Sequence, residues 1–547
     1  MASRRTLEYP DCSIYDFLYN NSKRYPDACA IDYFSSEMSY RSLLWEIDRC
    51  AAALKMLGVD KGDAVTVCLP NIPQAVIAFY AINKIGAIAN MIHPLSAENE
   101  ISHYLRLSES KIIIALDMVG SKIADAVINT PVEKVILASV KDYMPMLLRL
   151  AYTVSKVKKH NSEKRYLDWN GFMELAGKYT KDAYCHCSGS DCGVILYSGG
   201  TTGKPKGIML SNLNFNALAL QSIDGCGCLK EGDRVLSVMP VFHGFGLGVC
   251  IHTVLNFGGV AIILPQFKPK DFHKLIFKYR PNVIAGVPAI YEGLIHNKRL
   301  DGKDMSFIKC IISGGDSLPA PIKQRLNSVL LEHGCSAKVR EGYGLTECVT
   351  GSCLAPENST RYESVGLPYA DTFYKIVDIK TGRELPEGEV GEIVLRGPTV
   401  MMGYLKELEE TAMVLKVHDD GFTWLHTGDA GYMDGDGYVY FKQRIKRMII
   451  SCGYNIYPQN IEAVIDSHEE VMTCAVVGVP DNIRGQKVKA FVVCRNQNVD
   501  KEWLRGSILK HCEKNIAKYA MPREIEFVDS LPKTLVGKIA YNELINR

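Results

Sequence analysis

Short apolar runs rich in β-branched residues alternate with helical patterns in the first part of the chain. The first apolar runs lie at residues 64–69, 87–91 and 111–115, and the helical patterns between them at residues 73–85 and 98–108. A helix between two strands predicts that the strands are parallel, because the chain must cross back over the sheet. Further runs follow at residues 232–239, 261–264, 283–285 and 307–313. The pattern therefore predicts several parallel-sheet α/β layers before residue 340.

The sequence pattern changes after residue 374, where turns rich in Gly and Asp separate short predicted strands. Strands are predicted at residues 375–377, 391–396 and 438–441, which indicates a small antiparallel region. Beyond Lys446 the pattern is mixed, with a helix at residues 458–467 and strands at residues 471–477 and 489–493. A compact α+β C-terminal domain of about 100 residues is therefore expected.

Length and charge limit the classes of protein that this chain can belong to. A chain of 547 residues is too long for one core, so two or more domains are expected. The net charge of +2 gives no reason to propose a nucleic acid partner, since acids balance the basic residues along most of the chain. No secretory signal is recognised, and polar residues interrupt the most apolar window, residues 249–265. We expect a cytoplasmic protein with this window buried as a strand and a helix.

Eighteen cysteines are scattered through apolar runs, as small core residues of a reducing compartment would be. One cluster, Cys185-His186-Cys187 with Cys192, superficially resembles a metal site. It lacks the paired C-x-x-C spacing of structural zinc, so we interpret it as part of a loop.

The segment at residues 143–164 admits two interpretations. An apolar stretch, residues 144–152, is followed by Lys156, Lys158 and Lys159. An apolar helix with a basic tail is typical of binding to an anionic membrane surface. An ordinary packed helix with a solvated basic end is the more common case, and we favour it. Weak peripheral membrane contact stays open as the alternative.

A glycine- and hydroxyl-rich loop at residues 197–207, Tyr-Ser-Gly-Gly-Thr-Thr-Gly-Lys-Pro-Lys-Gly, follows an apolar run directly. Glycines let backbone N–H groups approach phosphate oxygens, while the threonines add hydroxyl donors and the lysines add positive charge. A Walker loop is excluded, because Ser198 and Pro205 stand where that motif needs a glycine and a Ser or Thr. The loop predicts a triphosphate clamp. Its expected phosphate-binding residues are Ser198, Gly199, Gly200, Thr201, Thr202, Gly203 and Lys206.

Four further motifs follow the loop in a definite order. They are Gly342-Tyr343-Gly344-Leu345-Thr346-Glu347, Thr427-Gly428-Asp429, Arg444-Ile445-Lys446-Arg447, and Pro532-Lys533-Thr534 with Gly537-Lys538. Together with the loop, the series resembles the adenylate-forming superfamily of acyl-CoA synthetases, firefly-type luciferases and peptide synthetase adenylation domains. The likeness is strongest to the AMP-forming fatty acyl-CoA synthetases, and it covers residues 13–544.

The resemblance implies an acyl-adenylate made from ATP and a carboxylic acid, with Mg²⁺ and cations stabilising the transferred charge. It places Thr346 at the α-phosphate and Glu347 on the magnesium, since a hard cation needs oxygen ligands. Lys538 would bridge the α-phosphate and the carboxylate of the acid. The remaining nucleotide-binding residues that it implies are Tyr343 at adenine, Gly344, Asp316, and Asp429 with Arg444 at the ribose.

The resemblance also implies a second half-reaction after a rotation about Lys446. Rotation would withdraw Lys538 and present residues 451–454, so that Gly453 and Tyr454 line the pantetheine of coenzyme A. Cys452 is then not needed as a nucleophile. The implied domains are residues 1–444, which bind the acid and ATP, and residues 445–547, a mobile domain that carries the catalytic lysine.

Residues 240–246 resemble the family's aromatic and histidine gate, which places His243 beside the acyl carboxylate. Peptide synthetase domains typically have an aspartate here, so Phe242-His243 argues against an α-amino acid. The pocket segments at residues 287–291 and 313–317 suit an aliphatic or aromatic tail. Because Gly314 and Gly315 leave room, we favour a medium- or long-chain fatty acid, with an aryl acid left open. Departures from the family pattern, at Gly199, Gln443, Gln486 and Tyr541, remove no named catalytic group.

These features together predict an AMP-forming acid:CoA ligase that uses ATP, Mg²⁺ and coenzyme A, with small molecules as its partners. Loading of the acyl group onto a carrier protein stays an alternative. So does a non-catalytic acyl or nucleotide sensor on the same fold. Retention of Lys538, Glu347, Asp429 and Arg444 speaks against the sensor, which has no use for a domain-mobile lysine.

Overall fold

The computed structural model describes residues 6–155, 165–198, 205–266, 268–295, 297–451, 454–456, 458–481, 485–496, 499–516, 520–534 and 538–545. The chain divides into two compact units. The first contains Met1–Phe373 and Arg396–Leu425, and the second contains Tyr374–Leu395 and His426–Arg547.

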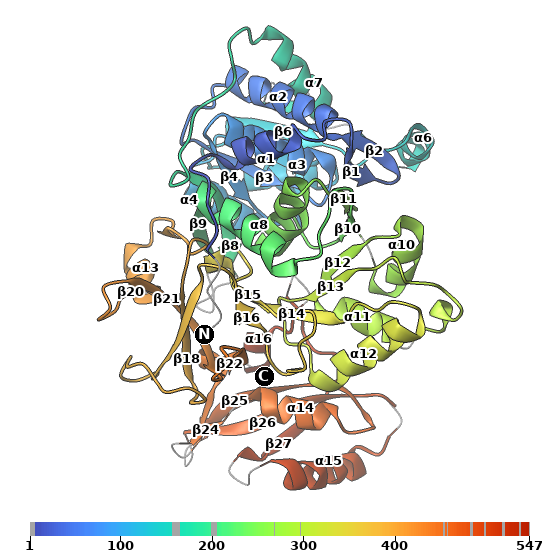
Figure 1. Ribbon diagram of the computed structural model, residues 1–547, viewed down its shortest axis with the longest axis vertical. Helices are drawn as coiled ribbons and strands as arrows, with labels where there is room; N and C mark the ends of the chain where they lie inside the picture. Colours follow the sequence, from blue (N-terminus) through green and yellow to red (C-terminus); the bar gives the residue numbers. More distant parts are fainter. Residues whose placement is uncertain are drawn as a thin grey trace. The chain divides into compact units, whose positions relative to one another are not determined.

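The first unit is built on two large sheets with helices packed against them (Figure 1). Among the described residues, one sheet has nine strands in the order β16-β15-β14-β13-β12-β10-β11-β1-β2. Its strands from β14 to β1 pair in parallel, whereas β2, β15 and β16 pair antiparallel at the two ends. The bounds are β1 Cys29–Tyr33, β2 Ser36–Ser39, β10 Arg234–Ser237, β11 Val260–Ile263, β12 Val283–Gly286, β13 Cys310–Ser313, β14 Val339–Tyr343, β15 Cys353–Leu354 and β16 Leu367–Pro368.

The second sheet of this unit has eight described strands in the order β19-β9-β8-β4-β3-β5-β6-β7. The strands from β8 to β7 are parallel, and β9 and β19 are antiparallel. Their bounds are β3 Ala64–Cys68, β4 Ile88–Met91, β5 Ile112–Leu116, β6 Lys134–Ala138, β7 Tyr166–Asp168, β8 Cys192–Ser198, β9 Lys206–Ser211 and β19 Gly403–Tyr404. The predicted parallel α/β layers are confirmed.

The parallel strands share one direction, so their carboxyl ends lie along the same edge of the sheet. Ser198 ends β8, and the chain leaves β5 and β6 at that same edge. The glycine-rich loop after Ser198 therefore starts at the edge of the sheet where the chain also leaves β5 and β6.

Helices connect most of these strands, and several are fixed by side chains at their first turn. Ser13 and Ser211 cap α1 and α8 by accepting backbone N–H bonds from Asp16 and Asn214. Every residue of α3 is buried, as expected for a helix covered on both sides. The bounds are α1 Ile14–Ser22, α2 Tyr40–Met56, α3 Pro73–Lys84, α4 Glu98–Ser108, α5 Gly120–Ala126, α6 Met146–Ser155, α7 Trp169–Glu174, α8 Asn212–Cys226, α9 Val254–Asn256, α10 Phe272–Tyr279, α11 Pro288–Ile295, α12 Ala320–Glu332 and α13 Leu408–Val414.

The second unit contains most of a small antiparallel sheet, which includes β17, β18, β21 and β22, and a compact α+β region after it. In the α+β region, β25 and β26 form a long antiparallel pair, and β27 runs parallel to β26. Ile461, Ile465 and Leu504 pack against these strands in one apolar core. The bounds are β17 Phe373–Val377, β18 Gly391–Arg396, β20 Leu415–Val417 (first unit), β21 Thr423–Met433, β22 Val439–Arg444, β23 Ile449–Ser451, β24 Tyr454–Ile456, α14 Pro458–Asp466, β25 Val471–Asp481, β26 Gly485–Cys494, α15 Lys501–Asn515, β27 Glu524–Phe527 and α16 Tyr541–Ile545.

The most apolar window is buried, as predicted, though its helical part is wider than an α-helix. Phe245–Thr253 form a π-helix, and β11 follows. Inside it, His252 is fully buried between Tyr80 and Asn216, and burial lowers the pKa of its imidazole to about 3. Among the helices in the described residues, none has both the length and the apolar character needed to cross a bilayer.

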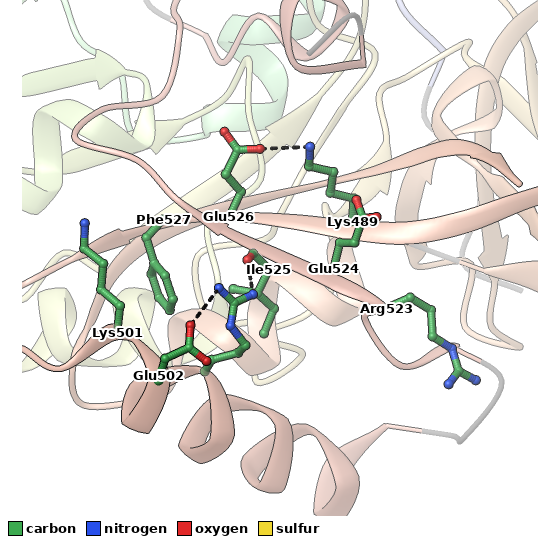
Figure 2. A pocket seen from close by; sticks show the side chains of 9 residues that line it. Lys489, Lys501, Glu502, Arg523, Glu524, Ile525, Glu526 and Phe527 are labelled. Atoms are coloured by element: carbon green, nitrogen blue, oxygen red, sulfur yellow. Dashed lines mark hydrogen bonds and ion pairs between the residues drawn. The ribbon is translucent and has the colours of Figure 1, made fainter.

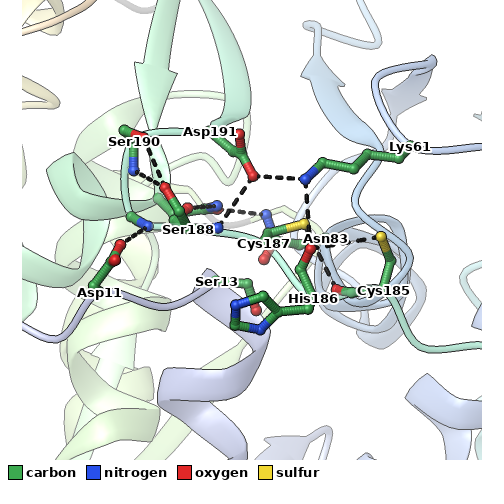
Figure 3. Close-up of polar contacts among 12 residues, drawn as sticks. Asp11, Ser13, Lys61, Asn83, Cys185, His186, Cys187, Ser188, Ser190 and Asp191 are labelled. Atoms are coloured by element: carbon green, nitrogen blue, oxygen red, sulfur yellow. Dashed lines mark hydrogen bonds and ion pairs between the residues drawn. The ribbon is translucent and has the colours of Figure 1, made fainter.

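The Cys185–Cys187 segment is a loop before β8, as predicted (Figure 3). Lys61 Nζ donates to Asp191 Oδ2 at 2.9 Å and to the His186 carbonyl at 3.4 Å, and Cys187 Sγ lies 3.6 Å from the Cys185 carbonyl. The described cysteines are all free thiols. An ordinary ion pair and backbone contacts therefore account for this cluster.

The expectation that the apolar stretch near residue 146 forms an ordinary packed helix is wrong. In α6, Met146 is 76% exposed, Leu147 is 82% exposed and Leu150 is 57% exposed. The helix lies in the connection between the parallel neighbours β6 and β7, and these three side chains stay exposed among the described residues.

Candidate active site

The predicted phosphate clamp is the connection of a β-hairpin. Ser198 at the end of β8 faces Lys206 at the start of β9. Lys206 Nζ forms an ion pair with Glu410 of α13 and lies 4.9 Å above the ring of Tyr404. The predicted residues Gly199, Gly200, Thr201, Thr202 and Gly203 lie outside the described residues.

The Thr346–Glu347 motif forms a tight 3₁₀ turn, Thr346–Cys348, directly after β14. A Cβ atom at Gly344 would stand 1.9 Å from the Thr350 carbonyl oxygen, so only glycine lets the chain close this turn. Val349, which ends it, has φ +64°, an unusual conformation for a β-branched residue. The turn is therefore a strained, closely packed support for two predicted catalytic side chains.

Tyr404 connects this turn to the phosphate hairpin. Its hydroxyl donates to Glu347 Oε1 at 2.9 Å, and its backbone pairs with Ile208 of β9. The Met401 amide donates to the Glu347 carbonyl at 2.8 Å. One tyrosine thus holds the Glu347 carboxylate and places its ring under the Lys206 ammonium.

The predicted histidine gate packs against the same turn. A Cβ atom at Gly244 would stand 1.7 Å from the Val349 carbonyl oxygen, so the backbones touch directly beside His243. The His243 carbonyl accepts from the Leu247 amide at 2.9 Å, and His243 Nδ1 accepts from the Phe245 amide at 3.2 Å. These contacts fix the imidazole at the start of the π-helix, a distortion frequent at functional sites.

The apolar segments expected to line the acid site meet here as well. The His93 and Phe242 rings lie 4.2 Å apart. A Cβ atom at Gly314 would stand 3.8 Å from the Phe245 ring, which is ordinary contact, so this glycine is not needed for room. Gly315 has φ +80°, a backbone conformation that favours glycine over any residue with a side chain. The exposed Asp316 accepts the amide of Ser317 at 2.9 Å.

The strand that leads to Tyr343 carries a buried carboxylate. Glu341 in β14 accepts from Lys323 Nζ at 3.4 Å and from the Leu318 amide at 3.2 Å. Burial raises the pKa of the Glu341 carboxyl to about 7, with Lys323 opposing the rise. Tyr343, two residues on, pairs with Cys353 of β15.

In the second unit, the predicted ribose-binding pair lies together. Asp429 in β21 and Arg444 in β22 are cross-strand partners, with Arg444 Nε 3.0 Å from Asp429 Oδ1. Asp429 is buried and its amide donates to Thr427 Oγ1 at 3.1 Å, while Arg444 is half exposed. The side chain of Thr427 donates in turn to the Ile393 carbonyl at 2.6 Å.

Lys538 sits in a second backbone-bonded turn of this unit. The Thr534 amide donates to the Lys538 carbonyl at 2.7 Å, and the Lys538 amide donates to Thr534 Oγ1 at 3.2 Å. Lys538 and Lys446 are both exposed. Gly453 lies outside the described residues, and Tyr454 begins β24.

Tyr541, where the family often has a basic residue, has a contact of its own. The Arg447 guanidinium lies 3.4 Å from the centre of the Tyr541 ring and donates to Glu462 Oε1 at 2.7 Å. Burial raises the pKa of Glu462, and Arg447 opposes the rise. The aromatic ring therefore stacks on a cation that is already paired.

A hollow of about 480 Å³ in the second unit lies between β26, α15 and β27 (Figure 2). It is lined by charged side chains that largely pair with one another, such as Lys489 with Glu526 at 2.8 Å and Arg505 with Glu502 at 3.6 Å. None of the predicted site residues that the structure describes lines it. We therefore do not assign it to the active site.

Sequence reasoning missed Tyr404 and Glu410. Both lie about 200 residues beyond the phosphate loop, and neither stands in a motif that points to it. The only local signal is the Gly403-Tyr404 pair ahead of an acidic helix start, which by itself indicates an ordinary turn.

Comparison with known proteins shows the family of this chain. Residues 18–405 match the family model of AMP-binding enzymes, and residues 460–538 match that of the AMP-binding enzyme C-terminal domain. The chain belongs to the AMP-binding enzyme family, which confirms the recognised adenylate-forming superfamily.

Among individual relatives, a long-chain-fatty-acid--CoA ligase of Bacillus subtilis (strain 168) is 35% identical over 98% of this chain and 95% of its own length. The crystal structure of ATP-bound MatB from Rhodopseudomonas palustris has a TM-score of 0.84 at 26% identity, covering 98% of this chain and 99% of that one. The anthranilate CoA ligase AuaEII, solved with anthranoyl-AMP, has a TM-score of 0.83 at 26% identity, covering 98% and 96%. The predicted fold class is confirmed.

Proposed function

We propose that the chain is an AMP-forming acyl-CoA synthetase that joins a medium- or long-chain fatty acid to coenzyme A at the expense of ATP. The observation that carries the proposal is the meeting of the phosphate hairpin and the Thr346–Glu347 turn at Tyr404. Full-length similarity to ligases named for long-chain fatty acids supports the choice of acid.

In the first half-reaction, a carboxylate oxygen of the acid attacks the α-phosphorus of ATP, and pyrophosphate leaves. The hairpin with Lys206 holds the β- and γ-phosphates, and Thr346 donates to the α-phosphate. Tyr343 and Gly344 hold the adenine, and Asp316 is proposed to contact the nucleotide. Asp429 accepts hydrogen bonds from the ribose hydroxyls, with Arg444 beside it. Lys538 neutralises the charge that develops between the acid and the α-phosphate.

The residues present suit Mg²⁺. Glu347 is a half-buried carboxylate that one tyrosine hydroxyl already orients, and oxygen is the ligand that this cation prefers. Mg²⁺ bound there would neutralise charge on the phosphates. Glu347 is its proposed ligand, and Tyr404 sets the direction of the carboxylate.

In the second half-reaction, the thiol of coenzyme A attacks the acyl carbonyl, and AMP leaves with the bonding electron pair. We propose that residues 445–547 move as a domain about Lys446 between the two steps, so that Gly453 and Tyr454 replace Lys538. Residues 1–444 would then form the acid- and ATP-binding domain. His243 closes the site beside the acyl carboxylate.

The chemical class of the acid is proposed from the apolar side chains around His243. Phe242 and Phe245 flank it, and the His93 and Val287 side chains lie near Phe242 and Gly315 respectively. Such a lining favours an apolar tail. An aryl acid remains the second candidate, because a relative of the same fold is an anthranilate CoA ligase. A cytoplasmic location is part of the proposal, supported by the free thiols of the described cysteines.

The test incubates the protein with ATP, Mg²⁺, coenzyme A and a panel of alkyl and aryl acids, and follows AMP and acyl-CoA. We expect the most acyl-CoA from the medium- and long-chain fatty acids of the panel. Acyl-hydroxamate in the presence of hydroxylamine without any acyl-CoA would instead indicate carrier-protein loading. If no acid in the panel yields AMP or pyrophosphate, the result would favour the non-catalytic sensor.

A further inference from the structure

A cluster of buried polar side chains lies beside the end of β8, where the phosphate loop begins. The hydroxyl of Tyr197, one residue before Ser198, donates to Asn90 Oδ1 at 2.8 Å. Asn90 lies in β4, the strand next to β8, and is fully buried. Its amide nitrogen donates to Thr66 Oγ1 at 2.8 Å and to Ser108 Oγ at 3.0 Å. The Asn90 carboxamide therefore uses both of its N–H donors and its oxygen.

The remaining hydrogen bonds close this cluster into a ring. Thr66 Oγ1 donates to Ser110 Oγ at 2.8 Å, and Ser108 Oγ lies 2.8 Å from Ser110 Oγ. Ser108 donates its one hydroxyl proton to the Tyr104 carbonyl at 2.8 Å, so Ser110 is the donor to Ser108. We call Asn90, Thr66, Ser108 and Ser110 the Asn90 cluster.

The ring determines which way the Asn90 amide points. Thr66 and Ser108 give their hydroxyl protons to other acceptors, so toward position 90 they can only accept. The amide nitrogen must then face these two hydroxyls, and Oδ1 must face Tyr197. Burial raises the pKa of the Tyr197 phenol well above its usual range, so the phenol keeps its proton and remains the donor.

Packing holds the ring of Tyr197 as firmly as the cluster holds its hydroxyl. The ring centroid lies 4.2 Å from that of Tyr104 in α4. A Cβ atom at Gly207, the cross-strand partner of Tyr197 in β9, would stand 3.4 Å from Tyr197 Cε1. The backbone that continues into Ser198 therefore starts from a side chain that is fixed at both its ring and its hydroxyl.

A fixed start of the phosphate loop favours ATP binding. Ser198 follows Tyr197 directly and pairs with Lys206, the proposed phosphate-binding lysine of β9. A loop whose ends are already positioned loses less conformational freedom when a ligand binds, so it binds that ligand more tightly. This step rests on the proposed function, in which the hairpin holds the β- and γ-phosphates.

We propose that Asn90 is a positioning residue for nucleotide binding, which acts by fixing Tyr197 at the start of the phosphate loop. In this role Asn90 touches no substrate, and its effect passes through the hydrogen bond from the Tyr197 hydroxyl. The rest of the Asn90 cluster serves to orient the amide.

The test measures ATP binding by isothermal titration calorimetry with Mg²⁺ and without acid, together with the KM for ATP and kcat. Tyr197→Phe removes the hydroxyl alone, and Asn90→Leu replaces the amide by an apolar side chain of similar size. Each variant should weaken ATP binding about fivefold, the size expected for one neutral hydrogen bond. The KM for ATP should rise to match, with kcat changed by less than about twofold, because the lost interaction acts in binding.

Tyr33→Phe is the matched control. The Tyr33 hydroxyl also donates a buried hydrogen bond of 2.8 Å, to the Val140 carbonyl, but Tyr33 lies in β1 of the nine-stranded sheet. This variant should lower the thermal unfolding midpoint and leave ATP binding unchanged. Circular dichroism shows whether each variant is folded. If Asn90→Leu does not fold, Tyr197→Phe, which removes one oxygen atom, decides the outcome.

The double variant Asn90→Leu/Tyr197→Phe tests whether Asn90 acts through Tyr197. We expect it to bind ATP no more weakly than Asn90→Leu alone, since two residues in one chain of contacts do not act independently. A loss equal to the product of the two single effects would overturn the proposal, and so would wild-type ATP binding by Tyr197→Phe. A wild-type protein that binds no ATP would refute the proposed function and this inference with it. ATP binding that the variants leave unchanged would refute this inference alone.

Discussion

Lys206 and Glu410 form an ion pair in the first unit, so the proposed phosphate-binding lysine is engaged by a carboxylate of α13. Their side chains are 19% and 36% exposed. The triphosphate of ATP would compete with Glu410 for the same ammonium. If Lys206 binds ATP as proposed, Glu410 would restrain nucleotide binding until ATP displaces it.

Glu410→Gln is expected to lower the KM for ATP. A partly exposed ion pair contributes up to about 1 kcal/mol, so KM should fall by no more than about fivefold. Pyrophosphate release at varied ATP measures it. Glu409→Gln, at the exposed neighbouring position, should behave as the wild type. A higher KM in Glu410→Gln would mean that Glu410 positions Lys206 for ATP rather than competing with it.

Tyr404→Phe is expected to raise the Mg²⁺ concentration needed for half-maximal adenylation by about tenfold. The variant removes the 2.9 Å bond to Glu347, and hydrogen bonds to charged groups are worth about 1.5–3 kcal/mol. The rate of pyrophosphate release is followed against Mg²⁺ at saturating ATP. Tyr362→Phe, a half-buried tyrosine elsewhere in the first unit, is the control. An unchanged Mg²⁺ dependence would separate Tyr404 from the metal site.

Lys538→Ala is expected to reduce adenylation by at least about a thousandfold and to spare thioester formation from supplied acyl-adenylate, since the lysine stabilises charge only in the first step. Single-turnover measurements of each half-reaction separate the two effects. Lys533→Ala changes another exposed lysine of the same turn and should spare both. Equal loss of both half-reactions in a folded Lys538→Ala protein would contradict the two-step domain movement.

The stability of the first unit is expected to fall as pH rises from about 5 to 7. Burial raises the pKa of Glu341 from 4.5 to about 7, so the folded state holds a proton that the unfolded state has released. The stabilisation is complete below the unfolded pKa and is lost as pH rises through the folded one, by up to roughly 3 kcal/mol.

Thermal unfolding at several pH values measures this loss. The side chain at position 341 of Glu341→Gln stays neutral at every pH. The thermal unfolding midpoint of this variant should therefore not fall between pH 5 and 7 as that of the wild type does. Glu332→Gln, on the exposed end of α12, should follow the wild type. Parallel curves for the wild type and Glu341→Gln would show that this carboxyl does not titrate between pH 5 and 7.

Much of the fold followed from local patterns. The helix predicted at residues 98–108 has those bounds, and the strand predicted at residues 391–396 has them too. The packing of α6 was predicted wrongly, because an apolar helical stretch has the same pattern whether another layer covers it or not. The glycines at 314 and 315 were interpreted as making room, whereas Gly315 is required by its positive φ.

The sequence by itself determined the alternation of elements, the family and the identity of most candidate residues, because these depend on local propensity and on motifs within single loops. Only the tertiary structure decided that Tyr404 holds Glu347, that Glu410 engages Lys206, and that the Gly244 backbone touches Val349. Such contacts join positions 57 to 204 residues apart. Their partners are chosen by how the sheets pack, which no stretch of sequence around either residue specifies.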